Sequence, residues 1–351
     1  MIILSTFLSS LGLGLTAQPK VIRWAKRKQH FDQTDSRKLH SGDISSLGGI
    51  GWIIATSCSS LVLGLVLGWD ARFMPLFCSM ALLFAVSLWD DLRPLSAGIR
   101  LLTQLLVTSS IYFVGWQLPL GWISYPATVI FLMAMINAFN FIDGINGLMA
   151  CISTIAFMGF GFLFAHQGHT QWAVLCAAAC GGLIAFLRYN FGRQAKIFMG
   201  DNGSTVIGLL LGVCFLQSLG INGFTLSRHN LWTALLVALP LVDLTRIVVL
   251  RLRQGHSPFH ADRQHFHHLF VDHGWTAPSV CRLVIGFNGG LLFICWNLPY
   301  LLVQATLCVT AYLVLFKYAN RQKRRLTIVP TQHVVEEKPV VFLESADELR
   351  A

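Results

Sequence analysis

The sequence predicts an all-α, polytopic membrane protein, and three observations support that prediction. Of the 351 residues, 54% are apolar and only 12% are charged, whereas soluble domains carry about 25% charged residues. The mean hydropathy is +0.62. Apolar stretches near the length of about twenty residues that a spanning helix needs recur along nearly the whole chain, with short polar segments between them. A soluble globular fold is therefore excluded.

We expect about 11 transmembrane helices, each bounded by a polar, Gly- or Pro-containing break. The expected spans cover residues 1–18, 47–67, 72–89, 101–116, 119–136, 146–165, 171–188, 204–220, 231–250, 281–297 and 299–316. The first span lacks the basic start and small-residue end of a signal peptide, so we expect it to remain as a helix. The transmembrane domain would then cover 1–316, and 317–351 would form a cytoplasmic, basic and then acidic tail that is disordered.

The Lys and Arg residues predict the orientation of these spans. All but two of the 26 basic residues, Arg72 and Arg228, fall in one set of alternating loops. Short loops rich in Lys and Arg stay in the cytoplasm. We therefore expect the N-terminus outside and the C-terminus cytoplasmic. The formal charge of +10 suits an anionic membrane surface and anionic substrates, and we expect no nucleic-acid partner.

The nine cysteines all lie in apolar segments and include no Cys-x-x-Cys pair. Free cysteine behaves as a small buried apolar residue. We interpret all nine as core residues, without a disulfide or a metal cage.

Acidic residues are scarce between Ala71 and His260, where the chain has only five. A carboxylate near membrane depth is costly and is a functional candidate by default. The five are Asp90, Asp91, Asp143, Asp201 and Asp243. The first four lie at the predicted cytoplasmic ends of three spans, so we expect them to converge on one site.

The adjacent carboxylates of Asp90 and Asp91 end one span before Pro94. Neighbouring carboxylates repel one another unless a cation or a proton lies between them, so a divalent metal is a natural explanation. The alternative is a solvated helix end. That reading is less favoured because acids oppose the dipole at a helix C-terminus.

A second block spans 137–148, with Asn137, Asn140, Asp143 and Asn146 recurring every third residue. A helical turn would bring them near one face. Their oxygen ligands suit magnesium or manganese. The alternative is a polar loop that uses Asn-Gly turn chemistry.

A third block places Asp201 after Gly200 at the start of a span. Such an acid can hold a metal ion while free backbone amides of the helix face phosphate oxygens. Asp201 could equally be an N-terminal cap, which is a common use of Asp.

A fourth block, 258–268, carries four histidines near an Asp and an Arg. Imidazole is a usual ligand of zinc. Because the other blocks offer oxygen ligands, a cluster of imidazole and guanidinium donors for a pyrophosphate is the favoured interpretation.

Together, these blocks resemble those of the polyprenyl-phosphate N-acetylhexosamine-1-phosphate transferases, the glycosyltransferase family 4 membrane enzymes. The blocks are Asp-Asp, Asn-x-x-Asn-x-x-Asp-Gly, Met-Gly-Asp-x-Gly-Ser and Asp-Arg-x-His-x-His-His, in that order. The resemblance extends from about Arg37 to Leu269 and is specific because all four blocks occur in order.

This resemblance implies an Mg²⁺-dependent phosphotransferase, with Mn²⁺ as an alternative ion. Its members transfer a sugar 1-phosphate from a UDP-N-acetylhexosamine to undecaprenyl phosphate, release UMP, and so start a lipid-linked cell-surface polysaccharide. The histidine block resembles the N-acetylglucosamine branch, while FucNAc, QuiNAc or MurNAc-pentapeptide donors remain alternatives. The resemblance also implies a bacterial cytoplasmic (inner) membrane protein with its active site on the cytoplasmic face, and leaves a homodimer open.

The resemblance also implies roles for particular residues. Asp90, Asp91, Asp143 and His265 would be catalytic, with Asp90 orienting or deprotonating the lipid phosphate. The expected metal ligands are Asp201, Asn140, Asp90 and Asp91. The expected nucleotide and diphosphate contacts are Asn190, Arg263, His265, His267 and His268. The expected lipid-phosphate clamps are Lys38 and Arg100.

Two departures from the family pattern bear on these roles. Many members have Asp at the position of Asn146, so one carboxylate is missing here. The first loop, 41–49, lacks the proline often found before its Gly pair.

Two other classes of membrane protein also use polar residues within a bundle. A transporter would be expected to show polar groups at mid-membrane depth in two related halves, and a CDP-alcohol phosphotransferase would show one dense Asp-Gly-x-x-Ala-Arg run. Neither pattern is apparent. Within the family chemistry, direct attack by the lipid phosphate competes with a covalent phospho-sugar on an aspartate.

Overall fold

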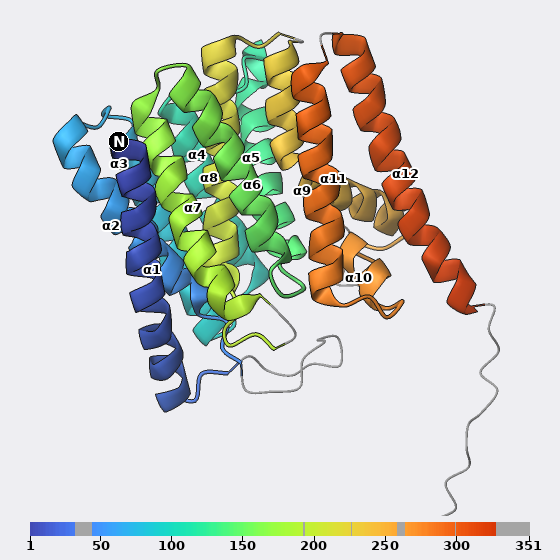
Figure 1. Ribbon diagram of the computed structural model, residues 1–351, viewed down its shortest axis with the longest axis horizontal. Helices are drawn as coiled ribbons and strands as arrows, with labels where there is room; N and C mark the ends of the chain where they lie inside the picture. The colour runs from blue at the N-terminus through green and yellow to red at the C-terminus, as the bar shows by residue number, and fades with distance from the viewer. Residues whose placement is uncertain (32–43, 192–193, 226, 258–263, 299, 328–351) are drawn as a thin grey trace, which may run out of the picture.

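The structure is a computed structural model that describes residues 1–31, 44–191, 194–225, 227–257, 264–298 and 300–327 (Figure 1). Within these ranges the elements are helices only, and no strand occurs. In chain order they are α1 (Ile2–Arg27), α2 (Gly48–Leu67), α3 (Phe73–Leu92), α4 (Ala97–Phe113), the short η1 (Gly121–Ile123), α5 (Ser124–Ile142), α6 (Leu148–His166), α7 (Thr170–Asn190), α8 (Asp201–Asn222), α9 (Arg228–Arg253), α10 (Phe266–Val271), α11 (Ala277–Asn297) and α12 (Leu301–Thr327).

The helices confirm the all-α, multi-pass membrane fold. Ten of those in the described ranges are long and apolar enough to cross a membrane. Each expected span overlaps a long helix. The remaining expected span, 101–116, corresponds to α4, which is not among these ten because it has only 17 residues. The six-residue helix α10 was not expected.

The first and last helices are longer than the sequence predicted. Helix α1 continues past Pro19 through the basic residues to Arg27, and α12 continues past residue 316 to Thr327. Lys, Arg and Gln are good helix formers, so a span can extend into the basic segment that flanks it. The start of the expected tail is therefore helical, and its remainder, 328–351, lies outside the described residues.

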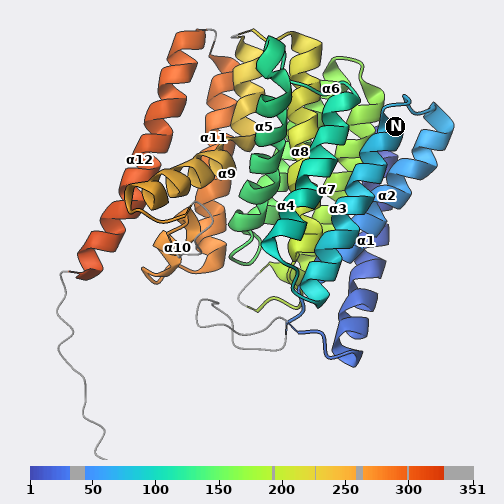
Figure 2. The ribbon, with the colours of Figure 1, turned by 180° about the vertical axis from the view of Figure 1, so that it is seen from behind.

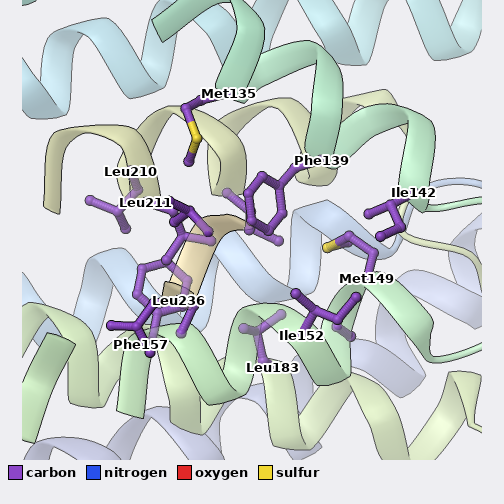
Figure 3. Packing of buried hydrophobic residues seen from close by; sticks show 14 of the residues in the cluster. Met135, Phe139, Ile142, Met149, Ile152, Phe157, Leu183, Leu210, Leu211 and Leu236 are labelled. Carbon is purple, nitrogen blue, oxygen red and sulfur yellow. The ribbon is translucent and has the colours of Figure 1, made fainter. Parts of the chain in front are cut away.

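Helix α8 is the centre of the bundle. It packs against α2, α3, α5, α6 and α9, and 83% of the apolar stretch of this helix is buried inside the protein. In Figure 3, Leu210 and Leu211 of α8 lie beside Met135 and Phe139 of α5 and Phe157 of α6, and all five are fully buried. A helix that is apolar all round needs such complete cover, so its polar N-terminal turn is held in a fixed place.

Several helix ends meet at one end of the bundle. Helices α3, α5 and α7 end there and α8 begins there, as both views show (Figures 1 and 2). Helix α9 contains Pro240, and its second half runs across towards α12 instead of along the bundle (Figure 2). An internal proline removes a backbone hydrogen bond and bends a helix.

The four expected carboxylates lie at the ends of α3 and α5 and at the start of α8. They therefore gather at one end of the bundle, as predicted.

All nine cysteines lie in the described residues and are free thiols, as expected. Seven are buried, whereas Cys58 and Cys78 are exposed. The prediction that all nine are core residues is therefore wrong for these two. Apolar sequence alone does not separate a helix face that packs on protein from one that faces lipid.

Candidate active site

The N-terminus of α8 is capped by a carboxylate from another helix. Asp91, in the last turn of α3, accepts hydrogen bonds from the backbone N–H of Asp201 at 3.2 Å and of Asn202 at 2.8 Å. It also accepts one from Asn202 Nδ2 at 2.6 Å. The first N–H groups of a helix have no partner within it and attract negative charge. Asp91 therefore holds the start of α8 against the end of α3.

Gly200, which precedes α8, has a backbone conformation that only glycine accepts easily. Its φ is +77°, and a Cβ there would meet Ser46 O and lie 2.9 Å from Asp91 Oδ2. Next to it, Gly48 N donates to Phe198 O at 2.8 Å and Gly49 N donates to Met199 O at 2.9 Å. The start of α2 thus packs backbone to backbone on the segment leading to Asp201, which leaves no room for a side chain.

Asn140, in the last turn of α5, contacts Asp201 directly. Its Nδ2 donates to Asp201 Oδ1 at 2.8 Å and lies 3.3 Å from Ser204 Oγ. The two residues are 61 positions apart in the chain. The structure therefore brings together these two expected metal ligands.

Asp143 lies just after α5 and joins the same cluster. The backbone N–H of Gly200 donates to its carboxylate. Burial, and the nearby carboxylates of Asp201 and Asp91, raise the pKa of Asp143 well above its ordinary value. Carboxylates from α3, the end of α5 and α8 thus repel one another across one small volume, as expected at a cation site.

Asp90 has different partners from Asp91. Its Oδ1 accepts from Leu95 N at 2.6 Å, and its Oδ2 pairs with Arg100 Nη1 of α4 at 3.3 Å. Neighbouring residues on a helix point about 100° apart, so the Asp-Asp pair is divided between α4 and α8. Arg100 is half exposed, at 48% of its side chain, which leaves its guanidinium accessible to a ligand.

Asn190, at the end of α7, ties three segments together. Its Oδ1 accepts from Gly147 N at 2.6 Å, and its Nδ2 donates to Ile197 O at 2.8 Å. The residue is only 4% exposed, and both the oxygen and the nitrogen of its side-chain amide are hydrogen-bonded. Asn190 therefore braces the segments that carry Asp143 and Asp201, while its expected nucleotide contact stays a prediction.

The histidine block packs beside the end of α5. The His265 ring lies 5.3 Å from that of Phe141 and 6.0 Å from that of His267. The His267 ring is 4.2 Å from that of His268. A Cβ on Gly144 would overlap the His267 imidazole, so this glycine makes room for the histidine. The expected acid and histidine groups therefore lie on neighbouring segments.

Asn137, the first member of the expected three-residue series, has a different partner from Asn140. Asn137 donates to Gln104 Oε1 of α4 at 2.8 Å and does not share the hydrogen bonds of Asn140. Steps of three residues drift by about 60° on an α-helix, and α5 ends before Asn146. Lys38 and Arg263 lie outside the described residues, so their expected roles stay predictions.

Three residues of the site were given no role by the sequence. Asn202 is fully buried, and its Nδ2 also donates to Ser46 O at 2.8 Å. Asp243 and Arg246 of α9 form an ion pair at 2.8 Å beneath His265. Asp243 is one of the rare acids within a span, but no sequence pattern indicates its histidine partner.

These features define a multi-pass membrane protein with a carboxylate-rich site at one end of its bundle. Residues 73–219 match the model of glycosyl transferase family 4. An undecaprenyl-phosphate alpha-N-acetylglucosaminyl 1-phosphate transferase of Yersinia pestis is 35% identical over 271 residues, covering 72% of both chains. The protein of that name in Escherichia coli K12 is 33% identical over 281 residues, covering 74% of both. A probable undecaprenyl-phosphate N-acetylglucosaminyl 1-phosphate transferase of Bacillus subtilis is 28% identical over 284 residues, covering 78% of both.

The chain belongs to glycosyl transferase family 4. This membership confirms the resemblance predicted from the four blocks. It makes the chain a membrane transferase, and it removes the transporter and CDP-alcohol phosphotransferase alternatives.

Proposed function

We propose that the protein transfers N-acetylglucosamine 1-phosphate from UDP-N-acetylglucosamine to undecaprenyl phosphate and releases UMP. The convergence of Asp91, Asp143 and Asp201 from separate segments around the Asn140–Asp201 contact carries this proposal. The substrates named for the relatives support it. FucNAc, QuiNAc and MurNAc-pentapeptide donors are the alternatives within the same chemistry.

We further propose that the cluster binds Mg²⁺. The donor set fits, because carboxylate and amide oxygens are the ligands that this ion prefers, and Mn²⁺ would suit the same set. A half-turn of the Asn140 amide exchanges its Nδ2 for Oδ1, so the group that donates to Asp201 could also ligate an ion. In the described part of the chain, no three His, Cys, Asp or Glu side chains form a ready cage. Water and substrate phosphate oxygens would therefore complete the coordination, as is usual for Mg²⁺.

The reaction requires two anions to meet. An oxygen of the lipid phosphate attacks the sugar-bearing phosphorus of the UDP-sugar, and the bond from that phosphorus to the bridging oxygen breaks as UMP leaves. When bound, Mg²⁺ would offset the charge of the phosphates and of the leaving group. This direct attack is our proposal, in preference to a phospho-sugar on an aspartate.

Particular side chains would assist this attack. Arg100 would draw the lipid phosphate towards Asp90, which orients it, and Lys38 would serve as a second clamp. His265, His267, His268 and Arg263 would contact the donor diphosphate.

We infer that the site faces the cytoplasm of the bacterial inner membrane, with the N-terminus outside. The basic residues gathered in one set of loops support this orientation, since the helix ends that carry the carboxylates share that side (Figure 1). UDP-sugars are then available on the side where the site opens. A homodimer is a further proposal, which cross-linking in membranes would test.

Purified protein with undecaprenyl phosphate and a panel of UDP-sugars tests the function. We expect Mg²⁺-dependent UMP release that is fastest with UDP-N-acetylglucosamine and stops in excess EDTA. No UMP from any donor would refute the proposal. Radiolabelled sugar phosphate trapped on protein in the absence of lipid would refute direct attack.

A further inference from the structure

A buried carboxylate on α9 lies outside the cluster described above. Asp243 is 3% exposed and accepts hydrogen bonds from three groups. Arg246 Nη2 lies 2.8 Å from its Oδ1, His265 Nδ1 lies 3.1 Å from its Oδ2, and Phe266 N lies 3.2 Å from both oxygens. A buried charge that is this fully paired has a fixed position.

The guanidinium of Arg246 is held in place by contacts with three groups, the first of which is Asp243. Its Nη2 also donates to Gln264 O, and its Cζ lies 5.2 Å from the centre of the Phe316 ring of α12. Phe316 packs in turn on Phe266, with ring centres 5.5 Å apart. Arg246 therefore neutralises Asp243 and fixes the peptide just before His265, and α12 covers the pair.

His265 links this buried pair to the active site. A carboxylate only accepts hydrogen bonds, so Nδ1 of His265 must carry the proton that Asp243 binds. The same ring lies against Phe141 of α5 and nearly parallel to His267, which occupies the space beside Gly144. Asp143 is the residue before Gly144. Nε2 is then the nitrogen left to act on a ligand in the site.

We propose that Asp243 is a positioning residue that orients His265 for the diphosphate of the nucleotide donor. Its carboxylate accepts from Nδ1 and so fixes the ring, and a proton on Nε2 can then be donated to a phosphate oxygen. Asp243 acts through His265 and touches no substrate. This inference rests on the proposed function.

Steady-state kinetics of the full-length protein test the inference. D243N keeps an acceptor oxygen but loses the charge. We expect it to raise the KM for UDP-N-acetylglucosamine about ten-fold, the lower range for loss of a hydrogen bond to a charged group. We expect kcat and the KM for undecaprenyl phosphate to change less than about three-fold, because only donor binding is affected.

Two further variants separate positioning from a general loss of structure. D243E restores the charge and should recover part of the lost donor affinity. In the double variant D243N/H265N the effects should not add to those of the single changes, because both act on one contact. D70N, which removes a carboxylate at the far end of α3, is the matched control and should behave as wild type. An unchanged donor KM in D243N, or fully additive effects, would overturn the inference.

A measurement without turnover distinguishes failure of this inference from failure of the proposed function. The ¹⁵N NMR signals of His265, assigned by their loss in H265N, should show a protonated Nδ1 in the wild type and a mixture of tautomers in D243N. Identical spectra would overturn the positioning role. A wild type with this signature but without UMP release would refute only the proposed function.

Discussion

Helix α8 is flanked by two glycines that have nearly the same backbone conformation but opposite surroundings. Gly200, before the first turn, has φ +77° and is enclosed by Ser46 O, Asn202 and Asp91. Gly223, after the last turn, has φ +74° and nothing within 4 Å of the position of a Cβ. Gly223 meets only a conformational need, whereas Gly200 also makes room for a site.

The acidic residues at the two ends of α3 differ in the same way. Asp70, before its first turn, is satisfied by one neighbour, Arg72, at 2.8 Å. Asp91, in its last turn, is engaged by backbone and side chain of another helix, close to Asp143 and Asp201. A carboxylate balanced within three residues stabilises a loop. Carboxylates that repel one another at the ends of several helices cost stability, which is typical of a functional site.

The largest expected effect is that of D201N. The change keeps an acceptor for Asn140 Nδ2 but removes the charge, so the fold should persist while kcat falls at least about 10³-fold. UMP release by purified protein measures it. Activity above about a tenth of wild type would reject Asp201 as a metal ligand.

The next largest effect separates the two glycines of α8. G200A should lower kcat about 10²-fold, because a Cβ against Ser46 O displaces Asp201 from its position. G223A carries the same cost of an alanine at positive φ without the overlap, so it should lose less than about two-fold in activity and about 1–3 kcal/mol in stability. Equal activities in the two variants would show that crowding at Gly200 is not functional.

D143N should have opposite effects on activity and stability. The pKa of Asp143 is higher in the folded protein than in the unfolded chain. Its ionised form therefore destabilises the metal-free fold at any pH above the pKa of Asp143 in the unfolded chain. Replacing it with a neutral amide should raise the midpoint of thermal unfolding in EDTA by about 2–4 °C, while activity falls at least about ten-fold. A lower midpoint would indicate that Asp143 is needed for folding.

The smallest effect is expected for D70N. Arg72 lowers the pKa of Asp70 through a hydrogen bond, so the pair stabilises the fold at neutral pH and loses this contribution as the pH falls through that lowered pKa. The side chains are 45% and 39% exposed for Arg72 and Asp70, so the loss should be well below about 1 kcal/mol. Thermal unfolding at neutral pH and at pH 3 measures the difference, which should be smaller at the lower pH.

The sequence was sufficient to predict the helices and the end of the bundle where the site lies. Hydropathy predicts spans because the bilayer imposes their length, and the scarcity of acids singled out Asp90, Asp91, Asp143 and Asp201. Spacing along one helix does not predict contacts that depend on packing between helices. The contact of Asn137 with Gln104 depends on how α4 lies against α5, which spacing along α5 does not encode.

Long-range partners were the part that sequence could not supply. Asp91 was expected to face Asp90 across a cation, yet it caps a helix that begins 110 positions later. The partner of His265 lies 22 positions earlier, within a span. Such pairs depend on the bend of α9 at Pro240 and on the packing of α3 against α8, both of which are tertiary features. The extent of α1 and α12 was missed because basic residues continue a helix as readily as they end a span.

The brace made by Asn190 also has a consequence for how the protein matures. Asn190 joins residues on both sides of α7, and Asn202 joins a segment 156 positions earlier in the chain. Contacts between such distant segments close late in folding. A nascent chain that has inserted α1–α7 would therefore possess most of its spans but no site. Competence for catalysis should not appear before α8 has entered the membrane between helices already in place.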